Sequence, residues 1–256
     1  MLDFDQYKKQ GEPSKLVKSQ IWQTAIGLQQ VDGLRPSNYL IETAKQNIEG
    51  EISFYEVKEQ IHTYYQQHPI TDPADRTNEA DVVSAHIAEI LSEETFTFSP
   101  AELTTIHQRL FTGIYPFAGK IRDYSIQATL DYDFQQEKKF DYKWLNDHQI
   151  VEHLAKFISS IWQIHPFGEW NTRAIAVFTI KYLRSFGFKV ENDMFADHAQ
   201  YFRNALVKAN YNDYQHHIFA TQEYLNQFFG NLLLGEHNEL KNRYLKIDTV
   251  NDTVES

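Results

Sequence analysis

The side chains of this chain that could do chemistry together are concentrated in one string, H-P-F-G-E-W-N-T-R, at residues 165–173. It offers an imidazole at His165, a carboxylate at Glu169, an amide at Asn171 and a guanidinium at Arg173. An uninterrupted apolar segment follows, and apolar residues recur at helical spacing before it. We therefore expect helix, short loop and buried helix, with the polar groups in the loop and in the first turn of the second helix.

Each of these groups has a role in handling phosphate. The free N–H groups and partial positive charge of a helix N-terminus suit an anion. Arg173 could hold a second phosphate, Glu169 is an oxygen ligand of the kind that Mg²⁺ takes beside a nucleotide, and His165 can accept a proton. Any one of them alone would be read as a loop histidine or a capping residue. Together they predict phosphoryl or nucleotidyl transfer.

The string resembles the signature of the Fic (Fic/Doc, or Fido) family, H-P-F-x-[D/E]-G-N-[G/T]-R, and the resemblance extends over most of residues 20–238. Trp170 is the one clear break, because the family has glycine there, and Gly168 stands at a variable position. The matching residues are His165, Pro166, Phe167, Glu169, Asn171, Thr172 and Arg173.

The resemblance implies a protein adenylyltransferase of the bacterial type, which moves AMP from ATP to a hydroxyl of a target protein. His165 would then be the general base and Glu169 the Mg²⁺ ligand. The α-phosphate would bind Asn171 and nearby backbone N–H groups, and the β- and γ-phosphates Arg173. The remaining implied roles are structural packing by Phe167 and nucleotide contact by Gly168, Trp170 and Thr172.

Trp170 leaves the activity open. Glycine lets the backbone approach phosphate and adopt a positive φ, which costs a residue with a Cβ roughly 1–2 kcal/mol. An indole beside the triphosphate would block it, whereas an indole that points outward would leave the site intact. The alternatives are therefore a Fic-fold regulatory or binding protein with weak or no transferase activity, or a transferase that uses a different nucleotide donor.

A second family-like passage, G-I-Y-P-F-A-G-K-I-R-D-Y-S-I, resembles the lead into the flap, a β-hairpin beside the active site. Alternation over Ile121–Ile126 predicts a strand. In the family the flap binds the target polypeptide by main-chain pairing, which implies target contacts for Lys120, Ile121 and Arg122. The alternative for the two cations is a pair of solvated hairpin charges.

A third passage, N-I-E-G-E-I-S, resembles the inhibitory helix of many Fic proteins, [S/T]-x-x-x-E-[G/N]. Glu49 and the glycine after it match, but Lys45 stands at the serine or threonine position. The family's inhibitory glutamate competes with the γ-phosphate for an arginine. Its usual partner, three residues past the first signature arginine, is Ala176 here, so Glu49 would use Arg173 or another donor. Otherwise Glu49 is an exposed residue before a C-cap glycine.

The predicted fold is all-α, a helical bundle around a central buried helix with one small β-hairpin. We expect an N-terminal helical appendage at 1–75, a Fic core at 76–235 and a polar tail at 236–256. Serines that precede amphipathic segments predict helix starts. These N-caps are Ser37, Ser53 and Ser99.

Composition narrows the function further. The 256 residues carry no cysteine and a formal net charge of −11, which excludes thiolate metal sites and argues against broad nucleic-acid binding. No run is long enough to span a membrane, and MLDFDQYKKQ lacks a signal-peptide pattern. No H-E-x-x-H or G-x-x-x-x-G-K-[S/T] occurs. We expect a cytoplasmic protein. Its expected partners are a target protein, the protein itself through self-modification, or a second copy in a homo-oligomer.

Overall fold

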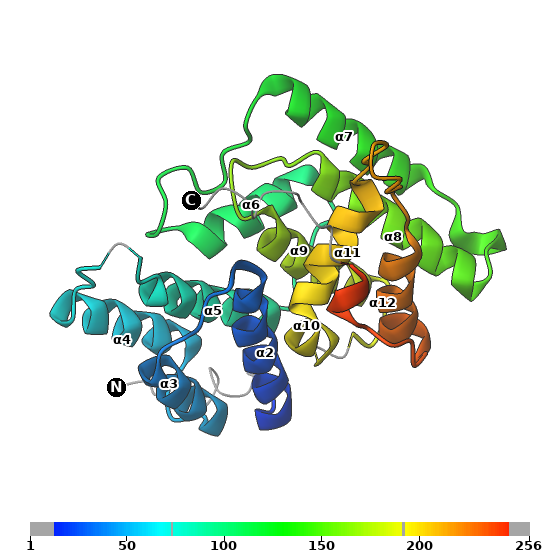
Figure 1. Cartoon of the computed structure of the whole chain (residues 1–256). Coiled ribbons are helices and arrows are strands. Elements are labelled where there is room, and N and C mark those ends of the chain that lie inside the picture. The colour runs from blue at the N-terminus through cyan, green and yellow to red at the C-terminus, as the bar shows by residue number, and fades with distance from the viewer. Residues whose placement is uncertain (1–12, 73, 191–192, 246–256) are drawn as a thin grey trace.

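The computed structural model describes residues 13–72, 74–190 and 193–245 (Figure 1). In this part of the chain the architecture is all-α, and the only β pairing consists of isolated bridges. The first helices are α2 (Lys15–Gly27), η1 (Leu28–Asp32), α3 (Asn38–Glu49), α4 (Phe54–Gln67), α5 (Thr77–Ser92) and α6 (Pro100–Phe111). The later ones are α7 (Tyr124–Lys139), η2 (Tyr142–Trp144), α8 (Asp147–Gln163), α9 (Asn171–Ser185), α10 (Asp193–Asp197), α11 (Ala199–Asn210), α12 (Glu223–Leu234) and η3 (Asn242–Tyr244).

Helix α9 is the centre of the molecule. Every residue from Asn171 to Leu183 is buried, and α5, α6 and α8 pack around it (Figure 1). Its apolar side chains join an aromatic core, in which Phe178 contacts Phe98 and Phe134 at ring-centroid distances of 6.1 and 5.5 Å. The predicted central buried helix is therefore confirmed.

One continuous hydrophobic core includes both the N-terminal helices and the rest of the described chain. Trp22 of α2 and Leu40 of α3 belong to the same buried cluster as Phe178, and α2 packs along α5. The division at residue 75 into appendage and core stays a prediction, since no second core marks it.

The helix starts follow the predicted caps. The side chains of Ser37, Ser53 and Ser99 accept hydrogen bonds from backbone N–H groups three residues on. Ser53 and Glu56 form the full capping box, with both reciprocal bonds present. These short-range signals place α3, α4 and α6 correctly.

The predicted strand at Ile121–Ile126 is wrong, and no β-hairpin flap forms in the described residues. Only Ile121 pairs, in a bridge to Phe167, and α7 begins at Tyr124. Asp123 explains the difference, because its side chain accepts the N–H of Ile126 at 3.0 Å and so caps a helix. The stretch after it, through Lys139, continues that helix.

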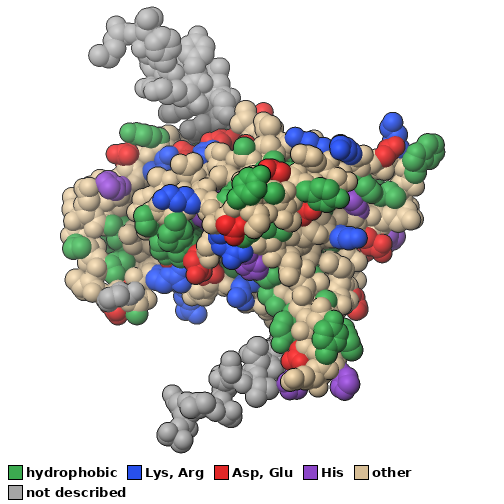
Figure 2. Space-filling view, turned by 90° about the horizontal axis from the view of Figure 1, so that it is seen from above, with side chains coloured by type: hydrophobic (Ala, Val, Ile, Leu, Met, Phe, Trp, Pro, Cys, Tyr) green, Lys and Arg blue, Asp and Glu red, His purple; other side chains and the backbone are tan. Residues whose placement is uncertain are grey.

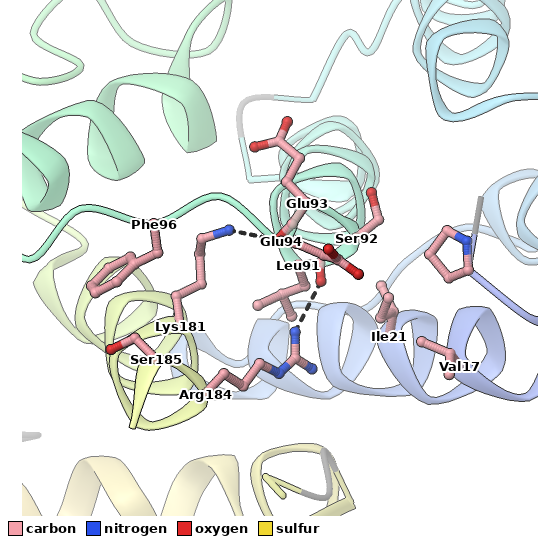
Figure 3. Close-up of a pocket in the computed structure, with 11 residues that line it drawn as sticks. Val17, Ile21, Leu91, Ser92, Glu93, Glu94, Phe96, Lys181, Arg184 and Ser185 are labelled. Carbon is pink, nitrogen blue, oxygen red and sulfur yellow. Dashed lines mark hydrogen bonds between the residues drawn. The ribbon is translucent and has the colours of Figure 1, made fainter. Parts of the chain in front are cut away.

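The other end of α9 borders a cavity of about 730 Å³ (Figure 3). Lys181 lies there and donates to the carbonyls of Ile90 and Glu93 at 3.0 and 2.9 Å, and Arg184 donates to Leu91 at 2.9 Å. These carbonyls end α5, so the two cations serve as its C-terminal partners. Burial lowers the pKa of Lys181.

On the face seen from above (Figure 2), hydrophobic side chains lie separately among charges of both signs. The most exposed of the large hydrophobic residues are Tyr124 and Trp144, each 87% exposed. Within the described residues, no helix has the length and apolar character required to cross a membrane.

Candidate functional site

The candidate site is the loop between α8 and α9. His165 and Trp170 have positive φ angles of 47° and 54°, which lets the chain reverse direction within a few residues. His165, Gly168 and Glu169 are exposed, whereas Phe167 is fully buried beneath them. The loop thus presents the side chains of His165 and Glu169 to solvent, and Phe167 packs underneath.

The imidazole of His165 has a defined orientation. Its Nδ1 lies 3.2 Å from the carbonyl oxygen of Gln163, and its ring packs at a tilt on Trp162 with centroids 4.7 Å apart. A carbonyl can only accept, so in the neutral ring Nδ1 carries the hydrogen and Nε2 keeps its lone pair. His165 can therefore receive a proton at Nε2 from an incoming hydroxyl.

The side chains of Asn171 and Thr172 hold the loop in place. The N–H of Phe167 donates to Oδ1 of Asn171 at 2.9 Å, and Nδ2 of Asn171 donates to the carbonyl of Phe167 at 3.0 Å. The hydroxyl of Thr172 accepts the indole N–H of Trp162 at 2.9 Å. Both side chains are buried. In this arrangement the amide of Asn171 is engaged with the loop itself rather than with the expected α-phosphate.

The backbone of the loop is different. Among the described residues, no acceptor lies within hydrogen-bond distance of the N–H groups of residues 169–173, and no side chain caps the start of α9. They end the loop and open α9, where the helix dipole adds partial positive charge. No side chain packs where a Cβ on Gly168 would stand. This run of unpaired N–H groups is suited to bind phosphate oxygens.

His107 of α6 supports the loop from below, and the sequence did not single it out. Its ring stacks on Phe167, with centroids 3.8 Å apart and planes at 20°. Nδ1 accepts the N–H of Gly119 at 2.9 Å, so Nε2 carries the hydrogen and lies 3.3 Å from the carbonyl oxygen of Glu169. Burial lowers the pKa of His107 to about 4. The neutral imidazole of His107 thus links the turn at Gly119 to the loop at Glu169.

The expected flap residues lie against the same loop. Ile121 bridges Phe167, and the N–H of Arg122 donates to the carbonyl of Pro166 at 3.0 Å. The Arg122 guanidinium donates to the carbonyl of Ile164 at 3.2 Å, while Lys120 is exposed. The main-chain pairing of the expected flap is therefore made with the loop of the same chain, whereas the resemblance implies pairing with a target strand.

Arg173 lies in a different place from the one its predicted role requires. It is fully buried, and its guanidinium lies over the ring of Phe111 at 5.0 Å. Nη2 donates to Glu79 at 2.7 Å, and Nη1 donates to Gln29 at 2.8 Å. Its Nε lies 2.8 Å from Asp32. The guanidinium does not face solvent, so it offers no hold for the β- and γ-phosphates in this structure.

Glu79 of α5 is the hub of this buried network. It also accepts bidentate bonds from Arg76 at 2.8 Å and the hydroxyl hydrogen of Tyr115 at 2.6 Å. Burial alone would raise the pKa of Glu79, but the bonds from Arg76, Tyr115 and Arg173 leave that pKa below its ordinary value. Burial and the Glu79 carboxylate raise the pKa of Tyr115 to about 12. The network therefore holds one carboxylate between two guanidinium groups.

The indole of Trp170 packs on the turn after α6. Its ring stacks on Tyr115 with centroids 3.7 Å apart and planes at 15°, and on Phe117 at 5.3 Å and 8°. Phe111 lies 5.5 Å away. These contacts offset the cost of the positive φ at Trp170, since aromatic pairs contribute roughly 0.5–1.5 kcal/mol beyond their buried area.

Glu49 does not reach Arg173. It ends α3 beside Gly50, whose φ is 81°, and it forms an ion pair with Lys15 in which both side chains are more than half exposed. The inhibitory contact expected from the resemblance is absent, and Glu79 is the glutamate that holds Arg173. The spacing Arg76-x-x-Glu79 indicates a local ion pair, but no signal in the sequence links Glu79 to a residue so far along the chain.

Comparison with known proteins gives one family. Residues 97–183 match the model of the Fic/DOC family. The matched stretch contains α6, the turn after it, the loop and most of α9. The match supports the interpretation of this chain as a Fic-family protein. Searches of curated proteins and of solved structures found no match.

Proposed function

We propose that this protein is a protein adenylyltransferase that moves AMP from ATP to a hydroxyl side chain. One observation carries the proposal: the unpaired N–H groups of residues 169–173 belong to the same loop and helix start as the exposed side chains of His165 and Glu169. An anion cradle beside a base and an oxygen ligand is the equipment of nucleotidyl transfer. The match to the Fic/DOC family over this stretch supports the same reaction.

In this proposal the backbone N–H groups bind the phosphates and orient the α-phosphorus. His165 Nε2 takes the proton of the attacking hydroxyl, which makes the oxygen a better nucleophile. The tautomer fixed by Gln163 leaves that nitrogen free for the task. Arg173 has no phosphate contact here, so binding depends on the amides and the metal.

Glu169 would hold Mg²⁺, which neutralises phosphate charge when it is bound. Mg²⁺ is usually held by one or two carboxylates together with substrate phosphates and water. One exposed carboxylate fits that pattern, and no group of three potential ligands from His, Cys, Asp and Glu exists in the described part of the chain. The metal would therefore bind together with the nucleotide.

The second candidate is a Fic-fold binding protein with little or no transferase activity. The burial of Arg173 among Glu79, Asp32 and Gln29 favours it, because a phosphate-binding group is then withdrawn from the site. The absence of a β-hairpin flap in the described residues favours it as well, since only Ile121 of the expected flap pairs, and it pairs with Phe167. The exposed His165 and Glu169 favour the transferase.

Incubation with α-labelled ATP and Mg²⁺ separates the two candidates. The wild type should label itself or proteins of a cell lysate, and His165→Ala should abolish the label. A matched control is His148→Ala, which removes an exposed histidine from the opposite end of α8 and should keep the label. Label that persists in His165→Ala, or none in the folded wild type, would refute the transferase and leave the binding protein.

A further inference from the structure

The corner where α7 meets α8 carries aromatic side chains that face solvent, and it lies at an outer edge of the molecule (Figure 1). Phe140 follows α7, Trp144 ends η2, and Phe186 follows α9; they are 37%, 87% and 47% exposed. The ring of Tyr142 joins two of them, at centroid distances of 4.9 Å to Phe140 and 5.5 Å to Phe186. Single exposed hydrophobic residues are ordinary, whereas a group of them marks an interaction site.

A buried polar hub beneath the corner fixes its position. The carboxylate of Glu137 accepts the hydroxyl hydrogens of Tyr142 and Tyr182, the second at 2.5 Å. Its other oxygen lies 2.7 Å from Nε2 of His153. Phe140 stacks on the His153 ring, with centroids 3.4 Å apart and planes at 9°. The aromatic rings are therefore presented to solvent by an anchored segment.

Four lysines accompany these rings, and none of the four pairs with a carboxylate in the described part of the chain. All are exposed: Lys138, Lys139, Lys143 and Lys189. The two acidic residues of the corner serve helix starts instead. Asp141 accepts the N–H of Lys143 at 3.0 Å and caps η2, and Asp147 lies in the first turn of α8. The corner is thus locally basic in a chain whose formal net charge is −11.

We propose that this corner binds the surface of a lipid bilayer that contains anionic lipids. The rings of Trp144, Phe140 and Phe186 would enter the headgroup region, where aromatic side chains are stable. The lysines would lie among the anionic headgroups, which attract clusters of basic residues. An apolar anchor beside a basic patch is the combination that holds peripheral proteins on such membranes.

The shape and charge of the molecule favour a bilayer over an acidic peptide. Peptides are usually recognised in a groove between helices or along a sheet edge. This corner consists of helix ends and a short 3-10 turn at the edge of the molecule (Figure 1). A projecting edge can meet a flat surface. Because the chain as a whole is acidic, an anionic bilayer repels its other faces and selects the basic corner.

Co-sedimentation of the full chain with vesicles tests the proposal. The wild type should bind vesicles of phosphatidylcholine and phosphatidylserine, but not vesicles of phosphatidylcholine alone, and added salt should release it. Lys143→Gln should weaken binding by about fivefold, the contribution of one lysine at an anionic surface. The matched control is Lys45→Gln. This exposed lysine belongs to α3, across the molecule from α7 and α8, and its loss should leave binding unchanged (Figure 1).

Tryptophan fluorescence reports on insertion directly. Trp22 and Trp162 are buried and Trp170 is half-buried, so Trp144 is the indole whose surroundings should change. We expect a shift of emission to shorter wavelength with the anionic vesicles. Trp144→Phe should remove the shift and keep binding, and Trp144→Ala should weaken binding several-fold. The control Tyr124→Ala removes an equally exposed ring at the other end of α7, about 22 Å from its last residue, and should keep both.

The proposal is overturned if the folded wild type does not bind the anionic vesicles at low salt. Equal binding to vesicles without phosphatidylserine, or undiminished binding by Lys143→Gln and Trp144→Ala, also overturns it. Calorimetric titration with a peptide rich in Asp and Glu tests the other occupant. Peptide binding that Lys143→Gln weakens, without vesicle binding, would assign the corner to a protein partner instead. These assays contain no ATP, so their outcome is independent of the proposed transferase.

Discussion

The carboxylate of Glu79 lies 2.7 Å from the guanidinium of Arg173, and both side chains are buried, at 5% and 0% exposure. They come from α5 and α9, which are distant in the sequence but packed together in the fold. The pair gives the signature arginine a structural partner within the chain. Glu49, on the exposed end of α3, pairs with Lys15 instead.

Breaking this pair should be costly. Glu79→Ala leaves the Arg173 charge buried with less compensation, so we expect a loss of about 3–5 kcal/mol in the free energy of unfolding. The double variant Glu79→Ala, Arg173→Met should lose less than the sum of the two single losses, because the two residues interact. Urea unfolding of all four proteins measures the coupling. Losses that simply add would show that the two side chains act independently.

The variant Trp170→Gly tests whether backbone strain or ring packing at this position has the larger effect on the free energy of unfolding. Glycine relieves a left-handed backbone cost of roughly 1–2 kcal/mol, but the variant loses the stack on Tyr115 and Phe117. Removing a buried aromatic typically costs about 3–5 kcal/mol. Since Trp170 is only half-buried, we expect a smaller net loss. Thermal unfolding measures it.

The same variant should bind ATP more tightly than the wild type, because a backbone without a Cβ can approach the phosphates more closely. Calorimetric titration of ATP in the presence of Mg²⁺ measures the change. Trp144→Gly is a suitable control, because Trp144 is 87% exposed and belongs to η2, away from the loop. Weaker binding in Trp170→Gly would show that the indole contributes to the nucleotide site.

His107 predicts a pH dependence of stability. Its pKa falls from 6.5 in the unfolded chain to about 4 in the fold. Between these values the unfolded state binds more protons, so the contribution to stability is complete above pH 6.5 and is lost as the pH falls toward 4. Its full size is ~3 kcal/mol.

His107→Phe keeps a ring on Phe167 but removes the titration. The difference in unfolding free energy between wild type and variant should therefore shift in favour of the variant as the pH falls through this window. Urea unfolding at several pH values measures it. A difference that stays constant across the window would mean that His107 does not titrate as its burial requires.

Asn171→Ala should loosen the loop. The substitution leaves both the N–H and the C=O of Phe167 without their partners, and each unsatisfied buried polar group costs about 1–3 kcal/mol. Hydrogen exchange should then speed up at the amides of residues 165–170 more than in the middle of α9. Equal protection in the variant and the wild type would show that Asn171 does not hold the loop.

The features that depend on residues close together in the sequence could be predicted from the sequence. The serine caps, the buried character of α9 and the loop between two helices at His165 all follow from local pattern. The strand predicted at Ile121 could not be excluded from the sequence, because alternation over a few residues is also typical of a strand. In the structure the Asp123 side chain caps α7, and the segment is helical from Tyr124 on.

The partners of the site residues could not be predicted, since they come from distant elements. Arg173 and Glu79 meet only because α5 packs on α9, and His107 reaches the loop only because α6 crosses beneath it. The orientation of Trp170 was left open by the sequence, and it is settled by the stack on Tyr115. Tertiary packing, rather than motif, assigns these roles.

The claim that the start of α9 binds the nucleotide can be tested most directly by NMR titration of the isotope-labelled protein with ATP and Mg²⁺. The account predicts that the backbone amide signals of residues 169–173 shift in a saturable way, together with the ring signals of His165. The amides of α4, which lies away from the loop, should stay unchanged. Saturable shifts confined to another surface, or none at the start of α9, would contradict it.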